Sequence, residues 1–240
     1  MSWKQSFVLI GHRGASAYEP ENTIRSFMKA IEMGVDAVEM DVRLTKDGIP
    51  IVIHDEDLKR VCGVDAKVRD LTLEEVKKYK VFGSEPIPTL EEALNAIDSR
   101  VGVLIELKEV GIESKVLEIV DKLGLKENVL IISFYLEALE KVRQLDSSID
   151  VGFITARTPI PIRELEKLKV FAVLPKFSIV TPMLVKELHA KRFRIYVWTV
   201  NDVATAIRMI NYGVDGIATD KPDIRFSIAK QVNLLKYGKM

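Results

Sequence analysis

The stretch ENTIRSFMKAIEMGVDAVEMDV, residues 21–42, contains an amphipathic segment and an apolar segment joined by a glycine. Apolar residues recur at helical spacing over Glu21–Met33, and Asn22 is a suitable N-cap for that helix. Gly34 is the kind of residue that follows a helix C-terminus, and Ala37–Val42 has the apolar character of a buried parallel strand. We therefore predict a helix followed by a buried strand, which is the repeating unit of an α/β fold.

The same alternation continues along the chain. Further apolar runs, rich in Val and Ile, are Phe7–Ile10, Val101–Leu107, Val129–Ser133, Val151–Ile154, Phe171–Leu174, Ile195–Trp198 and Asp215–Ala218. Further helical patterns are Leu90–Ile97, Glu113–Leu123, Leu136–Leu145, Ile162–Leu168, Pro182–Lys191, Asp202–Asn211 and Ile224–Leu234. Eight strands alternating with eight helices in 240 residues fit a (β/α)8 TIM barrel, which we predict as one domain over residues 1–240. A doubly wound sheet is disfavoured, because no G-x-G-x-x-G follows the first strand.

Composition excludes several classes of protein. Lys plus Arg and Asp plus Glu are 35 each, and this formal net charge of zero argues against a nucleic-acid binder. No apolar run approaches the ~20 residues needed for a transmembrane helix, and Phe7–Ile10 is too short for a signal-peptide core. The single cysteine, Cys62, excludes an intramolecular disulfide. We expect a cytoplasmic protein and leave its oligomeric state open.

One segment departs from the alternation. Nearly fifty residues separate the second predicted strand from the second predicted helix, too many for an ordinary connection. Asp47-Gly48 lies between two apolar runs and is typical of a β-hairpin, so the second strand is predicted to continue and fold back. A two-residue turn there would place His54 opposite Asp41 on the same side of the hairpin. A short insertion, at about residues 56–88, follows this hairpin.

Polar residues gather where the predicted strands end, and active sites of such barrels lie at that end. Glu39 and Asp41 are two residues apart and share one face of a strand, and Glu106 and Lys108 repeat the arrangement. Three inward carboxylates need a compensating charge, which a hard divalent cation with oxygen ligands would supply. The alternative is a buried salt-bridge network of these acids with Arg13 and Lys108.

Two of the three histidines are predicted to converge on these carboxylates. His12 ends the first strand and His54 follows the hairpin, and such a pair suits a general base and a general acid. His189 lies in a predicted helix and is expected to be a surface residue. Cationic side chains beside a metal suit a phosphate ester. Because neither a P-loop nor a G-x-S-x-G elbow occurs, the pattern favours hydrolysis of a phosphodiester.

The chain contains the short stretches GHRG (11–14), EPENT (19–23), VEMDV (38–42), TKDG (45–48), IHD (53–55), ELK (106–108), WTVN (198–201) and GIATDKP (216–222). Together these stretches resemble the glycerophosphodiester phosphodiesterase family. They occur in family order over most of the chain, which makes the set specific. The resemblance implies a (β/α)8 barrel and a metal-binding hydrolase of lipid and glycerol metabolism.

The resemblance also implies individual roles. The ligands of one divalent ion, Mg2+ or Ca2+ or alternatively Mn2+, would be Glu39, Asp41 and Glu106. The catalytic residues would be His12 as base and His54 as acid. The substrate-binding residues would be Arg13 and Lys108 at the phosphate, and Phe134 and Trp198 at the border of the pocket.

The implied reaction converts a small-molecule glycerophosphodiester into sn-glycerol 3-phosphate and an alcohol. The preferred alcohol is left open, as is the choice between a cyclic-phosphate intermediate and direct attack by water. Two alternatives remain. One is a lysophospholipase D acting on a lipid that keeps one acyl chain, and the other is a non-catalytic barrel that binds a phosphate ester.

Overall fold

The computed structural model describes residues 7–237, with side chains as far as residue 230. Its barrel strands are β1 (Val8–Gly11), β2 (Ala37–Leu44), β6 (Gly102–Leu107), β7 (Val129–Ser133), β8 (Asp150–Thr155), β9 (Ala172–Pro175), β10 (Arg194–Val197) and β11 (Gly216–Thr219). Neighbouring strands pair in parallel, and β1 pairs with both β2 and β11, which closes the sheet. The predicted (β/α)8 barrel is confirmed, whereas a single domain over residues 1–240 stays a prediction.

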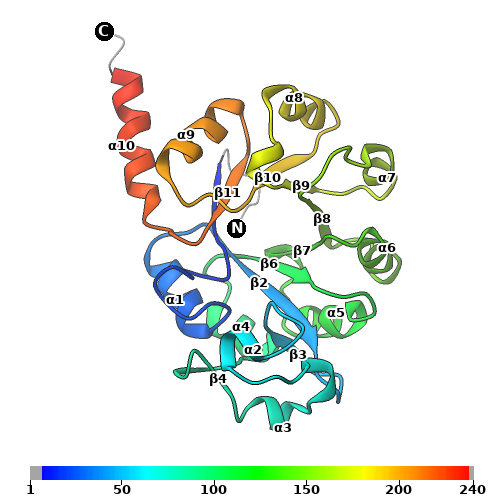
Figure 1. Ribbon diagram of the computed structural model, residues 1–240. Helices are drawn as coiled ribbons and strands as arrows, with labels where there is room; N and C mark the ends of the chain where they lie inside the picture. The colour runs from blue at the N-terminus through cyan, green and yellow to red at the C-terminus, as the bar shows by residue number, and fades with distance from the viewer. Residues whose placement is uncertain (1–6, 238–240) are drawn as a thin grey trace.

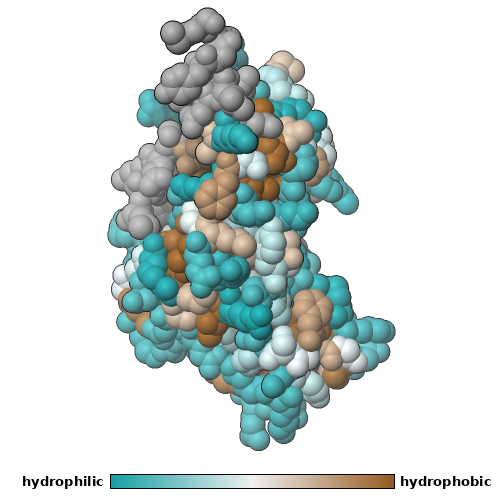
Figure 2. All heavy atoms as spheres, turned by 90° about the vertical axis from the view of Figure 1, so that its left-hand side faces the viewer, coloured by the Kyte–Doolittle hydropathy of each residue, from teal (hydrophilic) through white to brown (hydrophobic). Residues whose placement is uncertain are grey.

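Helices surround the strands (Figure 1). They are α1 (Ile24–Glu32), α4 (Leu90–Ile97), α5 (Glu113–Lys122), α6 (Leu136–Leu145), α7 (Ile162–Lys167), α8 (Pro182–Ala190), α9 (Val203–Tyr212) and α10 (Ile224–Tyr237). The largest apolar cluster lies between helices and strands, and a second fills the barrel interior with residues such as Ile10, Leu104 and Tyr196. The face that carries α1 and α10 is mainly hydrophilic with separate apolar patches (Figure 2). The apolar cluster between helices and strands follows from the alternation of apolar and polar positions in each helix, which gives the helix one apolar face.

After β2, strand β3 (Pro50–Val52) completes the hairpin, and the predicted insertion follows it. The insertion contains α2 (Lys59–Cys62), the 3-10 turn Val68–Asp70, α3 (Leu73–Val76), β4 (Lys80–Val81) and β5 (Glu85–Pro86). Strand β3 pairs antiparallel with β2, so the hairpin extends the second barrel strand as predicted. The insertion has a small apolar cluster of its own that includes Leu58, Val61 and Val68. This cluster fixes the backbone of α2 beside the mouth of the barrel.

The hairpin turn differs from the prediction by one residue. The ladder pairs Val42 with Val52, so Ile53 rather than His54 faces Asp41, and Ile53 N donates to Asp41 O at 2.9 Å. The loop has three residues because Gly48 adopts a left-handed conformation with φ of 76° and forms a bulge after the turn. The predicted two-residue turn, and with it the facing pair Asp41–His54, is therefore wrong.

Gly48→Val is expected to lower the free energy of unfolding by about 1–2 kcal/mol, the usual cost of a left-handed backbone for a residue with Cβ. A Cβ at Gly48 would meet nothing within 4 Å, so backbone strain rather than a clash is the cause. Urea denaturation measures the loss. The control Gly48→Asn should be milder, because Asn tolerates this conformation. Equal stability of the Val variant and the wild type would contradict this account of the turn.

Candidate active site

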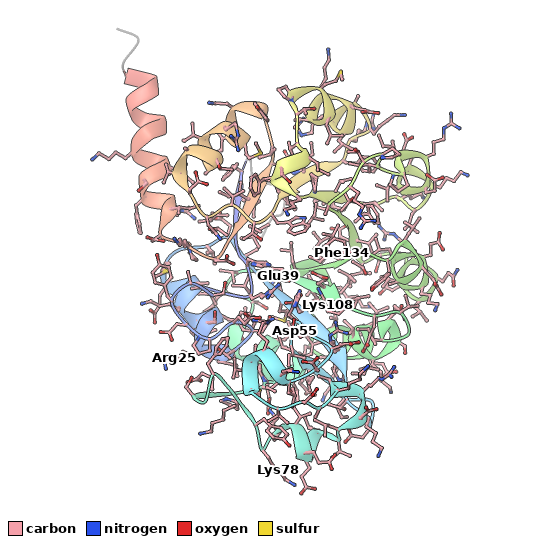
Figure 3. All side chains as sticks on the ribbon, viewed as in Figure 1. Arg25, Glu39, Asp55, Lys78, Lys108 and Phe134 are labelled. Atoms are coloured by element: carbon pink, nitrogen blue, oxygen red, sulfur yellow. The ribbon has the colours of Figure 1, made fainter. Side chains whose placement is uncertain are left out.

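Three buried carboxylates lie together at the mouth of the barrel. Glu39 and Asp41 point inward from β2, Glu106 lies one residue before the end of β6, and the two strands are paired so that Asp41 adjoins Glu106. One oxygen of each lies within 4.8 Å of those of the others. Figure 3 places Glu39 near the centre of the barrel, beside Lys108 and Phe134. The period of two along β2 causes this arrangement, since the intervening Val38, Met40 and Val42 are buried against the helices.

Two cations neutralise part of this charge. Arg13 Nε lies 3.1 Å from Asp41 Oδ2, and Lys108 Nζ lies 3.4 Å from Asp41 Oδ1 and 2.6 Å from Glu106 Oε1. Burial acts to raise the pKa of Asp41, but the charges of Arg13 and Lys108 outweigh it and lower that pKa to about 2. Asn22 supports the same carboxylate, since its Nδ2 donates to Asp41 Oδ2 at 2.8 Å. Asp41 is therefore held in its ionised form.

The other two carboxylates are not fully compensated. Burial, followed by the charge of Asp41, raises the pKa of Glu39 to about 7 and that of Glu106 to about 8. Glu39 Oε2 accepts from Arg13 N at 2.9 Å, but the buried Glu39 Oε1 has no hydrogen-bond partner among the described residues. A salt-bridge network of Arg13 and Lys108 therefore leaves negative charge and one orphaned oxygen. These residues fit a hard divalent cation, which favours oxygen ligands.

His12 and His54 are each oriented by an aspartate at Nδ1. His12 Nδ1 lies 2.6 Å from Asp220 Oδ1, and His54 Nδ1 lies 2.7 Å from Asp55 Oδ1. His12 Nε2 is 4.0 Å from Glu39 Oε2. An aspartate at Nδ1 fixes the ring and leaves Nε2 for other partners, which suits proton transfer.

His54 reaches the site by a route that the sequence did not indicate. It follows β3 rather than facing Asp41, and Arg43 Nε donates to its carbonyl oxygen at 2.9 Å. Its side chain still lines the same cavity as His12 and Glu39.

The two histidines differ in their electrostatic surroundings. Burial acts to lower the pKa of His12, but the Asp220 hydrogen bond and the charge of Glu39 outweigh it and raise the pKa. Burial lowers the pKa of His54, and the attraction of Asp41 does not offset burial and the charges of Arg13 and Lys108. Burial and the charges of the chain together therefore raise the pKa of His12 and lower that of His54.

One cavity of about 220 Å³ unites most of the predicted site residues, and it has a charged half and an apolar half. Its predicted residues are His12, Arg13, Glu39, His54, Glu106, Lys108, Phe134 and Trp198, while Asp41 lies beneath them in contact with Arg13 and Lys108. The apolar half consists of Leu104, Ile132, Ile154, Leu174 and Ala218 with the two aromatic rings. Phe134 and Trp198 meet edge to face at 5.6 Å between ring centroids. Such a cavity suits a small molecule with an anionic group and an apolar part.

The third histidine lies elsewhere. His189 is on α8, where its Nε2 lies 2.9 Å from Asp215 Oδ2 and its side chain is 40% exposed. It does not line the cavity.

The sequence did not predict the hydrogen bonds that orient His12 and Asp41. Asp220 binds His12, and in turn accepts from Ser16 Oγ at 2.9 Å and Asn201 Nδ2 at 2.6 Å. It directly follows β11, so the same rule that selected the ends of the other strands would have found it. Asn22 is a suitable N-cap by residue type, but Thr23 is the N-cap and α1 starts at Ile24. Asn22 instead has a left-handed backbone, with φ of 57°, and binds Asp41.

Comparison with known proteins gives a consistent result. The model of the glycerophosphoryl diester phosphodiesterase family matches residues 12–224. A glycerophosphodiester phosphodiesterase of Bacillus altitudinis is 35% identical over 93% of this chain and 98% of its own length. That of Caldanaerobacter subterraneus subsp. tengcongensis is 34% identical over 93% and 98%.

Solved structures agree. A phosphodiesterase of Oleispira antarctica, in complex with the product sn-glycerol-3-phosphate, is 29% identical with a TM-score of 0.84, over 94% of this chain and 96% of that one. With the barrel, the acidic cluster and the family model all in agreement, the chain belongs to the glycerophosphoryl diester phosphodiesterase family.

Proposed function

We propose that the protein hydrolyses glycerophosphodiesters to sn-glycerol 3-phosphate and an alcohol. The observation that carries the proposal is the cavity at the C-terminal end of the barrel strands. Two buried carboxylates, two cations and two histidines line it, and the third carboxylate, Asp41, lies beneath them. The relative from Oleispira antarctica with bound sn-glycerol-3-phosphate supports this substrate class. Among residues 7–237, no helix has the length and hydrophobicity of a membrane-spanning helix. Residence in the cytoplasm stays a prediction.

Glu39, Asp41 and Glu106 are proposed to hold one divalent cation, Mg2+ or Ca2+ or alternatively Mn2+. The orphaned Glu39 Oε1 supports this role. When bound, the cation would supply positive charge against the phosphate. Arg13 and Lys108 are proposed to contact the phosphate oxygens, because both cationic side chains belong to residues that line the cavity.

His12 is proposed as general base and His54 as general acid. The charges of the chain alone order their pKa values in the opposite sense. Two charges would be added in the loaded complex. A cation beside Glu39 would lower the pKa of His12, and the phosphodiester anion would raise the pKa of His54. The base accepts a proton from the attacking hydroxyl, and the acid donates one to the leaving alcohol. Whether that hydroxyl belongs to water or to the glycerol stays open.

Phe134 and Trp198 are proposed to border the substrate pocket. Phe134 and the adjacent Tyr135 are exposed apolar residues after β7. This exposed pair favours a second candidate substrate, a lysophospholipid cleaved by lysophospholipase D activity, since an acyl chain could lie across it. A non-catalytic barrel is less favoured, because binding alone would not explain why an aspartate orients each of the two histidines.

A turnover assay tests the function. Glycerophosphocholine, glycerophosphoethanolamine and lysophosphatidylcholine are each incubated with Mg2+, Ca2+ or Mn2+, and the release of sn-glycerol 3-phosphate or lysophosphatidic acid is followed. We expect turnover of the soluble diesters. Release of lysophosphatidic acid alone would favour the second candidate. Binding of sn-glycerol 3-phosphate without turnover in any metal would favour the non-catalytic barrel.

A further inference from the structure

Arg60 lies in the insertion, and its guanidinium joins two carboxylates at the edge of the site. Its Nη1 and Nη2 donate to Glu21 Oε2 and Oε1 at 2.7 Å each, and its Nε donates to Asp55 Oδ2 at 2.6 Å. A planar guanidinium that binds a carboxylate through two nitrogens fixes direction as well as distance. Arg60 therefore links the loop before α1, the residue after His54, and α2.

Each of these two carboxylates also contacts a residue of the proposed active site. Asp55 Oδ1 binds His54 Nδ1 at 2.7 Å. Glu21 Oε1 also accepts from Arg13 Nη1 at 2.9 Å. Arg60 is thus connected to the proposed general acid, His54, through Asp55, and to a proposed phosphate contact, Arg13, through Glu21.

The backbone below Arg60 is well fixed. Leu58 and Val61 are buried in the apolar cluster of the insertion. Helix α2 ends at Cys62 and is capped by Gly63, which has a left-handed backbone and donates its N–H to Lys59 O at 2.9 Å. Asp55 lies between α2 and the centre of the barrel in Figure 3. The position of the guanidinium therefore follows from the core of the insertion.

The contacts of Arg60 suit a role in positioning as well as in stability. Its side chain is 45% exposed, so solvent weakens its ion pairs, although a bidentate arginine–carboxylate pair is stronger than an ordinary exposed one. Small displacements of reacting groups, in contrast, change rates strongly. We propose that Arg60 is a positioning residue, which holds His54 through Asp55 and Arg13 through Glu21. This inference rests on the proposed function and gives the insertion a part in the reaction.

Kinetics of Arg60→Met, with Arg69→Met as the matched control, test the proposal. Arg69 belongs to the same insertion, is 73% exposed, and lies 4.0 Å from Asp70. We expect Arg60→Met to lower kcat by about 10–10²-fold and to raise KM, because both partners lose their alignment. Arg69→Met should match the wild type. Arg60→Lys should recover part of the activity, because lysine keeps the positive charge but lacks the planar group that binds a carboxylate through two nitrogens.

The link to His54 through Asp55 and the link to Arg13 through Glu21 can be tested separately. Asp55→Asn should act mainly on kcat through His54, and Glu21→Gln mainly on KM through Arg13. In a His54→Ala background, Arg60→Met should cost little further kcat, because the group that it positions is gone. Kinetic constants of Arg60→Met equal to those of Arg69→Met would overturn the proposal, and so would an undiminished kcat effect in the His54→Ala background. Should Arg60→Met unfold on circular dichroism, Arg60→Lys and the two single carboxylate variants decide.

One readout needs no turnover, so a failure of the proposed function is distinguishable from a failure of this proposal. His54 is titrated by NMR in the Mg2+-supplemented protein. Asp55 and Asp41 favour its protonation, whereas Arg13 and Lys108 oppose it. Removing Arg60 leaves the charge of Asp55 less compensated, so Arg60→Met should raise the pKa of His54 by about half a unit or more. An unchanged titration contradicts the link through Asp55, even in a protein that hydrolyses no glycerophosphodiester.

Discussion

Replacing His12 or His54 by alanine is expected to lower kcat by about 10²–10⁴-fold each, the usual range for a positioned proton acceptor or donor. Both rings line the cavity, and each is oriented by an aspartate at Nδ1. The double variant should lose much less than the product of the two losses, because the pair acts as a unit. Steady-state kinetics on glycerophosphocholine measure these effects.

The pH profile separates the two roles. The pH dependence of kcat reports the enzyme–substrate complex. A base must be deprotonated there, so kcat falls below its pKa, and an acid must be protonated, so kcat falls above its pKa. His12→Ala should therefore remove the acidic limb, and His54→Ala the basic limb. Loss of the limbs in the reverse order would exchange the two assignments.

His189→Ala is the control for both variants. His189 lies on α8, binds Asp215 and does not line the cavity, so its loss should leave kcat unchanged. Comparable losses for His189→Ala and His12→Ala, in folded proteins, would show that the catalytic pair is assigned wrongly.

Removing the divalent cation is expected to abolish turnover and to make stability depend on pH. Without a cation, burial and the charge of Asp41 raise the pKa of Glu39 to about 7 and that of Glu106 to about 8. Both return to an ordinary pKa near ~4.3 on unfolding. The folded state therefore binds more protons than the unfolded state, and the free energy of unfolding falls as the pH rises from about 5 to 8.

Urea denaturation at several pH values, with EDTA or with excess Ca2+, measures this dependence. The cation should flatten the profile, because it stabilises the ionised carboxylates that repel one another in its absence. Glu39→Gln should lose cation binding and the part of the pH dependence that belongs to Glu39. Full turnover after exhaustive chelation, with metal content checked by elemental analysis, would refute the metal site and favour the salt-bridge network.

The sequence alone predicted the barrel because its signals are local and repeated. Each apolar run, such as Ala37–Val42, is followed by an amphipathic pattern, and right-handed closure of eight such units leaves little choice of topology. The inward direction of Glu39 and Asp41 followed from the period of two along a strand. Their meeting with Glu106 followed because the strand ends of a barrel share one rim.

Tertiary structure decided how the second histidine is held. The conformation of Gly48 changed the hairpin register by one residue, and a dipeptide that suits either a two- or a three-residue loop cannot determine this. Glu21 and Arg60 are 39 positions apart and meet only because the core of the insertion brings α2 to the barrel mouth. Periodicity describes which face a residue occupies, but contacts between distant side chains depend on the packing of whole elements.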